Sequence, residues 1–194
     1  MKDIKIIKNF LPTDYVTDLT NVLESQGDNT SFPWFFSSRT GPPIKDVTFK
    51  DTSQLVHVFW TNPKAFQNHH VSQYWELVRP ILYFVKDKCD IEYRTIIRVK
   101  ANLLIPQPNF TKDDFNLPHV DHAGTENYLN IIYFVNESDG DTFIFDGTPP
   151  SLTIKQRITP EANSVLIFDG DVYHASSNPI KSDKRIIINT TVGM

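Results

Sequence analysis

Two histidines, one aspartate and one arginine are the residues of this sequence whose types and spacing could carry out chemistry. His119 and Asp121 lie two positions apart, so on an extended strand their side chains would point to the same face. A second imidazole, from His174, would complete a set of two histidines and one carboxylate. That ligand set leaves adjacent coordination positions open and is typical of non-heme Fe(II) oxygenases. We therefore predict a metal site formed by His119, Asp121 and His174, which would also be the catalytic residues.

Arg185 follows His174 at the start of an apolar run, Ile186–Ile188. A charge at such a position has no evident reason to be there unless an anion pairs with it. Because a guanidinium grips a carboxylate with two parallel hydrogen bonds, Arg185 beside the metal would suit a co-substrate with a free carboxylate.

Strand alternation extends the list of candidate binding residues. On the strand expected around Arg185, the residues Asn189 and Thr191 share its face, and Asn130 occupies an inner-face position on the strand expected over 128–135. We predict that Asn130, Asn189 and Thr191 help to bind a co-substrate, with a purely structural role for each left open.

Two helical patterns and a series of short strands organise the chain. Apolar spacing predicts one helix after Leu11-Pro12, with Thr13 as its N-cap, and a second helix over Val71–Lys88 that Pro80 would kink or break. After Cys89, short β-rich segments separated by turns favour a sandwich or barrel. The prediction is an α+β, mostly β, single domain over 1–194, in which 1–90 is a helical support and 91–194 carries the site. The strands are expected over 4–10, 55–60, 93–105, 128–135, 142–145, 152–158, 164–168 and 185–192.

Bulk composition narrows the classes of function. The net charge of −4 lowers the expectation of nucleic-acid binding, although a local basic patch stays open. Cys89 is the single cysteine, so it forms no internal disulfide and no thiolate metal cluster. Neither a signal peptide nor a membrane-spanning apolar run is evident, and we expect a soluble, cytoplasmic protein that does not bind membranes.

In these features the chain resembles the 2-oxoglutarate and Fe(II)-dependent dioxygenases, in particular the prolyl 4-hydroxylase-like branch. The resemblance covers most of the chain. Its ordered matches are His119-x-Asp121, the strand ending in Tyr133-Phe134-Val135-Asn136, the segment Asp139–Phe145, the segment Pro160–Asp169, His174 and Arg185.

The resemblance implies a double-stranded β-helix, or jelly-roll, supported by N-terminal helices. It further implies Fe(II) on the two histidines and Asp121, 2-oxoglutarate as co-substrate with its far carboxylate on Arg185, and O₂. The reaction would hydroxylate a C–H bond, of a peptidyl prolyl or similar side chain, with release of succinate and CO₂. This sequence departs from the family where a glycine pair is replaced by Gly140-Asp141, and where a tyrosine is missing near Asn102-Leu103.

Two other functions stay open at this point. One is oxygenation of a small metabolite or a modified nucleobase, which the acidic net charge disfavours in its nucleic-acid form. The other is a non-enzymatic jelly-roll that binds metal structurally, although such a site gains nothing from open coordination positions. The sequence does not identify the substrate, which could be a peptide or a small molecule.

Overall fold

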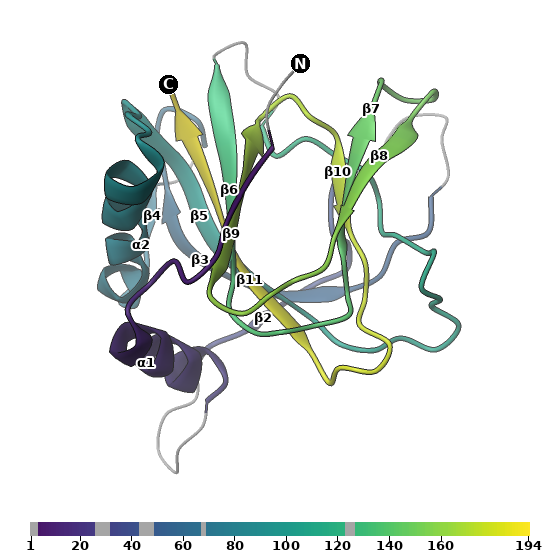
Figure 1. The fold of residues 1–194 in the computed structure, drawn as a ribbon, viewed down its shortest axis with the longest axis horizontal. Coiled ribbons are helices and arrows are strands. Elements are labelled where there is room, and N and C mark those ends of the chain that lie inside the picture. The colour runs from purple at the N-terminus through teal and green to yellow at the C-terminus, as the bar shows by residue number, and fades with distance from the viewer. Residues whose placement is uncertain (1–3, 26–31, 43–48, 67–68, 123–126) are drawn as a thin grey trace.

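A computed structural model describes residues 4–25, 32–42, 49–66, 69–122 and 127–194 of the chain. Two antiparallel sheets face each other, and two helices cover the outer face of the larger sheet (Figure 1). The helices are α1 (Thr13–Leu23) and α2 (Trp75–Cys89). The strands are β1 (Lys5–Ile7), β2 (Phe35–Ser37), β3 (Gln54–Thr61), β4 (His70–Val71), β5 (Thr95–Leu104), β6 (Tyr128–Phe134), β7 (Thr142–Asp146), β8 (Thr153–Ile158), β9 (Ser164–Asp169), β10 (His174–Ser176) and β11 (Arg185–Gly193).

The larger sheet has the strand order β1-β9-β6-β11-β5-β3-β2, with β4 paired to β3. The smaller sheet has the order β10-β7-β8. Strands far apart in the sequence thus become neighbours, since β11 at the C-terminal end lies between β5 and β6. This arrangement of two facing sheets with supporting helices is the jelly-roll that we expected.

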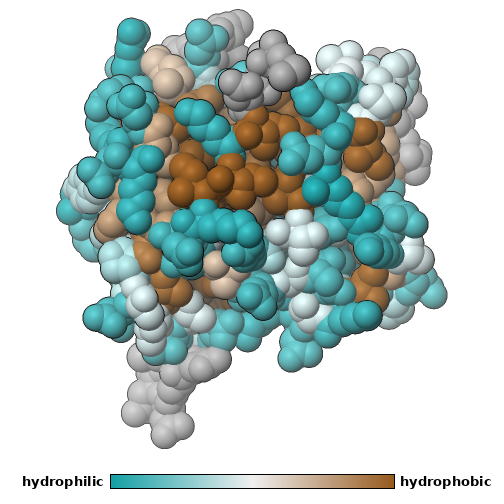
Figure 2. All heavy atoms as spheres, viewed as in Figure 1, coloured by the Kyte–Doolittle hydropathy of each residue, from teal (hydrophilic) through white to brown (hydrophobic). Residues whose placement is uncertain are grey.

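Side-chain alternation gives the larger sheet two different faces. Its outer face packs apolar residues of β5, β6, β9 and β11 against both helices; among them are Val99, Ala101, Ile131, Val165 and Ile188. A second apolar cluster fills part of the space between the sheets, with Ile132, Phe134, Phe168 and Ile187 from the larger sheet and Ile144 from the smaller. Figure 2 shows the side of the molecule that is turned to the viewer in Figure 1, and hydrophobic residues gather near its middle. Elsewhere the inner face carries both polar residues, such as Arg98, Lys100 and Asn189, and apolar ones, such as Val56, Val58 and Leu104.

The N-terminal part of the chain does more than supply helical support. Four of its strands, β1 to β4, join the larger sheet, and β3 pairs directly with β5. No sequence pattern predicted β2 or β4, which are too short to show alternation. Residues 43–48 of the irregular segment between β2 and β3 lie outside the described residues. The single-domain boundary at 1–194 stays a prediction.

The two predicted helices need small corrections. Thr13 is the first helical residue of α1, and Pro12 occupies the N-cap position without a side-chain cap hydrogen bond. The second helix begins at Trp75 rather than Val71, because His70 and Val71 pair with β3 and Ser72 accepts the first backbone hydrogen bond from Trp75. Pro80 lies inside α2 without ending it. Its missing N–H leaves the Glu76 carbonyl, four residues earlier, without its helical partner.

No helix among the described residues is long and apolar enough to span a membrane.

Candidate metal centre and adjoining hollows

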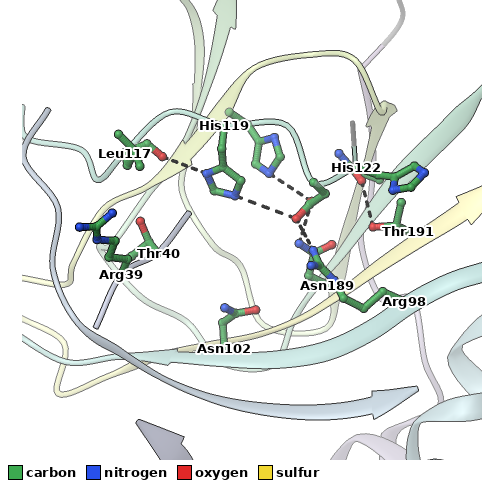
Figure 3. A network of polar contacts seen from close by, with 12 residues as sticks. Arg39, Thr40, Arg98, Asn102, Leu117, His119, His122, Asn189 and Thr191 are labelled. Atoms are coloured by element: carbon green, nitrogen blue, oxygen red, sulfur yellow. Dashed lines mark hydrogen bonds and ion pairs between the residues drawn. The ribbon is translucent and has the colours of Figure 1, made fainter. Parts of the chain in front are cut away.

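His119, Asp121 and His174 come together at one point between the two sheets (Figure 3). Their ligand atoms all lie within 4.8 Å of one another. Nε2 of His174 is 3.3 Å from Oδ2 of Asp121, and Nε2 of His119 is 4.0 Å from Oδ1. The side chain of Asp121 is 1% exposed. The sequence therefore identified three residues that the fold does bring together, although their role as metal ligands stays a prediction.

We expected an extended strand to bring the side chains of His119 and Asp121 together, but the structure uses a different local arrangement. His119 belongs to an isolated β-bridge with His174, in which each residue donates its backbone N–H to the carbonyl of the other, at 2.9 and 3.0 Å. His174 opens β10, a short strand that was not predicted and that pairs with β7. The bridge fixes the two imidazoles side by side, with ring centroids 4.7 Å apart.

Both imidazoles are held in the orientation of a metal ligand. Nδ1 of His119 lies 2.9 Å from the Leu117 carbonyl, and Nδ1 of His174 lies 3.2 Å from the Val172 carbonyl. A carbonyl oxygen only accepts, so in each pair the Nδ1–H donates and a neutral ring keeps its lone pair on Nε2. Such a hydrogen bond on the far nitrogen is the usual support of a metal-bound histidine.

Asp121 is oriented by two donors from the inner face of the larger sheet. Arg98 of β5 donates from Nη2 to Oδ1 at 2.7 Å, and Asn189 of β11 donates from Nδ2 to Oδ2 at 2.9 Å. Burial raises the pKa of the Asp121 carboxyl, but His174 and the charges of Arg98 and Lys100 favour the ionised form more strongly, so the pKa lies well below its usual value. Burial and the neighbouring His174 lower the pKa of His119 to about 4, which keeps its ring neutral near pH 7.

These protonation states make the centre suitable for a cation. Nε2 of the neutral His119 and the ionised carboxylate of Asp121 face each other as acceptors, and His174 presents its Nε2 to the same carboxylate at 3.3 Å. A divalent metal would relieve the repulsion, and nitrogen and carboxylate ligands in this ratio suit Fe(II). The donor chemistry therefore fits the predicted metal.

Arg185 lies at the start of β11 and is 1% exposed. Its Nε donates to the Gly140 carbonyl and its Nη2 to Oγ1 of Thr142, both at 2.7 Å. Burial lowers the pKa of Arg185 to about 10, and the guanidinium forms no ion pair with any described residue. Both hydrogen-bond partners of the guanidinium are neutral, and the carboxylate of Asp141 raises its pKa without forming an ion pair with it. A further anion on Arg185 would offset more of the cost of burying its charge.

Arg185 and the metal centre share one narrow hollow between the sheets, which we call the inner hollow. Its volume is about 30 Å³. The residues that line it include both histidines, Arg185, Asn189 and Thr142, and also Thr40, Gln54, Lys100, Asn102, Leu104, Ile132, Ala175, Ser176 and Ile187. An anion on Arg185 would therefore extend toward the two imidazoles.

A wider groove opens on the other side of His119 and has a volume of about 430 Å³. We call it the outer groove. Arg98, Lys100 and Asp121 line it, together with Ser37, Arg39, Thr40, Gly41, Pro42, Gln54, Val56, Val58, His119 and Val120. Thr40, Gln54, Lys100 and His119 border both spaces, so the metal centre lies where they meet.

Two of the three predicted co-substrate ligands lie away from the inner hollow. Thr191 Oγ1 lies 3.3 Å from Oδ1 of Asn130 in the buried interior, and neither residue lines the inner hollow. Asn189 does line it, but its amide nitrogen is engaged with Asp121. The carbonyl oxygen of Asn189 and the amide nitrogen of Asn130 are buried without a partner.

Arg98, Lys100 and Asn102 are polar residues of the site that the sequence analysis did not identify. They alternate along β5 with Val99 and Ala101, which face the helices. That alternation was visible in the sequence. Polar positions on one face of a strand are, however, usually on the solvent side, so the pattern did not point to an interior site.

Comparisons with known proteins connect this geometry to solved structures. No protein-family model matches the chain, and no curated protein matches it. An oxidoreductase of the 2OG-Fe(II) oxygenase family from Burkholderia pseudomallei is similar in structure, with a TM-score of 0.67, 13% identity, and coverage of 98% of this chain and 84% of that one.

Two further structures show the breadth of the similarity. A prolyl hydroxylase from Trichoplax adhaerens, in complex with a hypoxia inducible factor oxygen degradation domain peptide fragment, has a TM-score of 0.57 and 13% identity over 98% of this chain and 83% of that one. The non-heme alpha ketoglutarate dependent epimerase SnoN from nogalamycin biosynthesis has a TM-score of 0.61 and 9% identity over 99% of this chain and 78% of that one. At such identities the likeness establishes the shared fold, and with it the predicted jelly-roll.

Proposed function

We propose that this protein is a 2-oxoglutarate- and Fe(II)-dependent dioxygenase that hydroxylates a C–H bond. The observation that carries the proposal is the inner hollow. The two oriented imidazoles line one part of it, beside the ionised carboxylate of Asp121, and the buried guanidinium of Arg185, which has no ion-pair partner among the described residues, lines another part. A non-enzymatic metal site would not need that guanidinium. The structural neighbours described as 2-oxoglutarate oxygenases support the same conclusion from the fold.

The protein's own residues would divide the work. His119, His174 and Asp121 would hold the iron, with Leu117 and Val172 fixing the rings and Arg98 and Asn189 fixing the carboxylate. When bound, iron with 2-oxoglutarate and O₂ supplies the oxidising chemistry and releases succinate and CO₂.

Arg185 would bind the far carboxylate of 2-oxoglutarate, and the apolar residues between the sheets would exclude water around it. The inner hollow is narrow, so we expect 2-oxoglutarate to move the side chains that line it when it enters. Thr142 of β7 accepts a hydrogen bond from Arg185 and would contact the same carboxylate.

The finer predictions remain proposals. Neighbours with this fold include both a hydroxylase and an epimerase, so the fold itself does not select among reactions. The prolyl side chain as substrate and the cytoplasmic location also stay predictions.

The experiment is the anaerobic addition of Fe(II) and 2-oxoglutarate to metal-free protein, followed by visible absorption for the charge-transfer band of the chelate. Wild type should show the band, and His174→Ala should abolish it. Arg185→Ala should keep the band but require at least about tenfold more 2-oxoglutarate, because it loses the charged partner of the far carboxylate. Lys155→Met, on β8 far from the hollow, is the control and should behave like wild type. A folded, iron-loaded wild type without the band would favour a structural metal site instead.

A further inference from the structure

The outer groove has an excess of positive charge where a substrate would lie. Among the described residues that line it, Arg39, Arg98 and Lys100 are basic and Asp121 alone is acidic. Arg98 is already paired with Asp121 at 2.7 Å. The groove therefore keeps two cations, Arg39 and Lys100, whose charges no acidic residue of its lining balances.

Lys100 is the more informative of the two. Its side chain is half-buried and borders both the inner hollow and the outer groove, yet its ammonium group makes no hydrogen bond or ion pair with any described residue. Burial and the nearby Arg98 lower the pKa of Lys100 to about 8, while Asp121 acts in the opposite direction. An ammonium group that is desolvated without a partner is a cost that a bound anion would remove.

Strand pairing places Lys100 close to the metal centre. On the larger sheet it is the direct cross-strand neighbour of Asn189, the residue that donates to Asp121. Paired residues of an antiparallel ladder have Cα atoms about 5 Å apart. An anion bound by Lys100 would therefore lie beside the metal centre. The carbon that reacts must lie beside the same centre, so the anionic group and that carbon could be only a few bonds apart.

Arg39 stands at the rim of the same groove. Its main chain is fixed, since its carbonyl accepts hydrogen bonds from Nε2 of Gln54 at 2.7 Å and from Oγ of Ser37 at 2.8 Å. Its side chain is exposed and makes no hydrogen bond with the described residues. Figure 3 shows Arg39 and Thr40 on the opposite side of His119 from Arg98 and Asn189, so Arg39 and Arg98 border the site from different sides.

From this arrangement we propose that the substrate is a small molecule that carries an oxyanion, a carboxylate or a phosphate group, close to the carbon that is oxidised, and that Lys100 binds this group with help from Arg39. The proposal rests on the proposed oxygenase function and narrows its substrate class. The groove volume of about 430 Å³ lies within the range of small-molecule sites. An internal residue of a peptide has neutral amides next to its reacting side chain and would leave Lys100 unpaired.

The test measures binding to protein that has been loaded anaerobically with Fe(II) and saturating 2-oxoglutarate, so that Arg185 is already occupied. The probes are free L-amino acids and sugar phosphates, each beside its neutral counterpart, the amino-acid amide or the unphosphorylated sugar. Peptides with the same amino acid at an internal position form a third arm. Two readouts are followed: the change in the charge-transfer band and the shift in the thermal midpoint.

For wild type we expect at least one oxyanion probe to bind about tenfold or more tightly than its neutral counterpart. Lys100→Met, which keeps the aliphatic stem, should lose that preference, and Lys100→Arg should keep most of it. Arg39→Gln should weaken binding by a smaller factor because the side chain is exposed. The half-saturating concentration of 2-oxoglutarate should stay within about twofold in Arg39→Gln, and in the two Lys100 variants it should rise by much less than tenfold; Lys155→Met is again the control.

Several results would overturn the proposal. Equal binding of charged and neutral probes, binding of the peptides alone, or no response to any probe would each do so. A tenfold rise in the 2-oxoglutarate requirement of Lys100→Met would show that Lys100 holds the co-substrate instead. These outcomes differ from failure of the oxygenase function, in which wild type lacks the band before any probe is added.

Discussion

The amide nitrogen of Asn189 donates a hydrogen bond to Oδ2 of Asp121 at 2.9 Å, although the two residues are 68 positions apart in the sequence. Asn189 lies on β11 and Asp121 follows the bridge residue His119, so the contact ties the larger sheet to the metal centre. The carbonyl oxygen of Asn189 is buried without a partner. Its position on the wall of the inner hollow makes it available to a bound molecule.

Replacement of Asn189 should therefore weaken metal binding without removing a ligand. Asn189→Ala is expected to lower the affinity for Fe(II) by roughly 10- to 100-fold, the usual effect of losing a residue that orients a metal ligand. Anaerobic metal titration followed by calorimetry measures this. Asn62→Ala, which removes amide hydrogen bonds to β5 away from the centre, is the control and should leave the affinity unchanged. An Asn189→Ala protein with wild-type affinity would mean that Arg98 alone is sufficient to orient Asp121.

Arg98 should affect both stability and metal binding. Arg98→Met leaves the buried carboxylate of Asp121 without its charged partner, so the free energy of unfolding should fall by up to about 3 kcal/mol, with the partial exposure of the guanidinium limiting the loss. Because Arg98 helps to hold the pKa of Asp121 down, its removal should also move the loss of metal binding to a higher pH. Denaturant unfolding and metal titration across pH 4 to 7 measure the two effects.

Arg157 offers a matched comparison for Arg98, because it pairs with Asp141, a buried aspartate on the smaller sheet. Arg157→Met should lower stability in a similar way and leave the metal affinity and its pH dependence unchanged. If both variants change metal binding equally, the effect of Arg98 is a general loss of stability and not a local one.

The lowered pKa of His119 predicts how the metal-free protein responds to acid. Burial and His174 shift it from 6.5 in the reference state to about 4 in the folded protein. Between these values the unfolded chain binds the proton more readily, so stability should fall as the pH decreases from about 6.5 to about 4, by at most about 3 kcal/mol from this group. His119→Gln should reduce the slope of unfolding free energy against pH in that window. Asn62→Ala, which removes no titratable group, is the control and should leave the slope as it is; an unchanged slope in His119→Gln would contradict the assignment.

The sequence contained enough information to identify three residues that converge in the fold, His119, Asp121 and His174, and most of the strands. The two-residue spacing of His119 and Asp121, the apolar run after Arg185 and the turn before His174 are local signals, and the corresponding residues lie together in the fold. The sequence did not show which strands, distant along the chain, pair with each other. The positions of Arg98 and Lys100 beside Asp121 depend on β5 lying next to β11, and no local pattern specifies that neighbour.

Asn130 and Thr191 show a second reason why the sequence alone could not predict the whole site. Alternation correctly placed them on the inner face, where they are cross-strand partners, but it could not tell which part of that face borders the hollow. The sheet is long enough for one stretch of its interior to bind a ligand and another to be filled by its own polar contacts.

Gly41 provides a test of how closely the segment after β2 approaches the metal centre. A Cβ at this position would come within 2.7 Å of Nδ1 and 2.8 Å of Cγ of His119, closer than side-chain atoms pack. Since the bridge with His174 holds the backbone of His119, the imidazole has little freedom to retreat, and its hydrogen bond to the Leu117 carbonyl at 2.9 Å would be disturbed. Gly41→Ala should therefore weaken Fe(II) binding by about tenfold or more while the protein stays folded. Metal titration with circular dichroism measures both properties, and Ser38→Ala, on the exposed part of the same segment, should match wild type. A Gly41→Ala protein that binds iron normally would show that this segment can move away from His119, and that the outer groove is wider in solution than the structure has it.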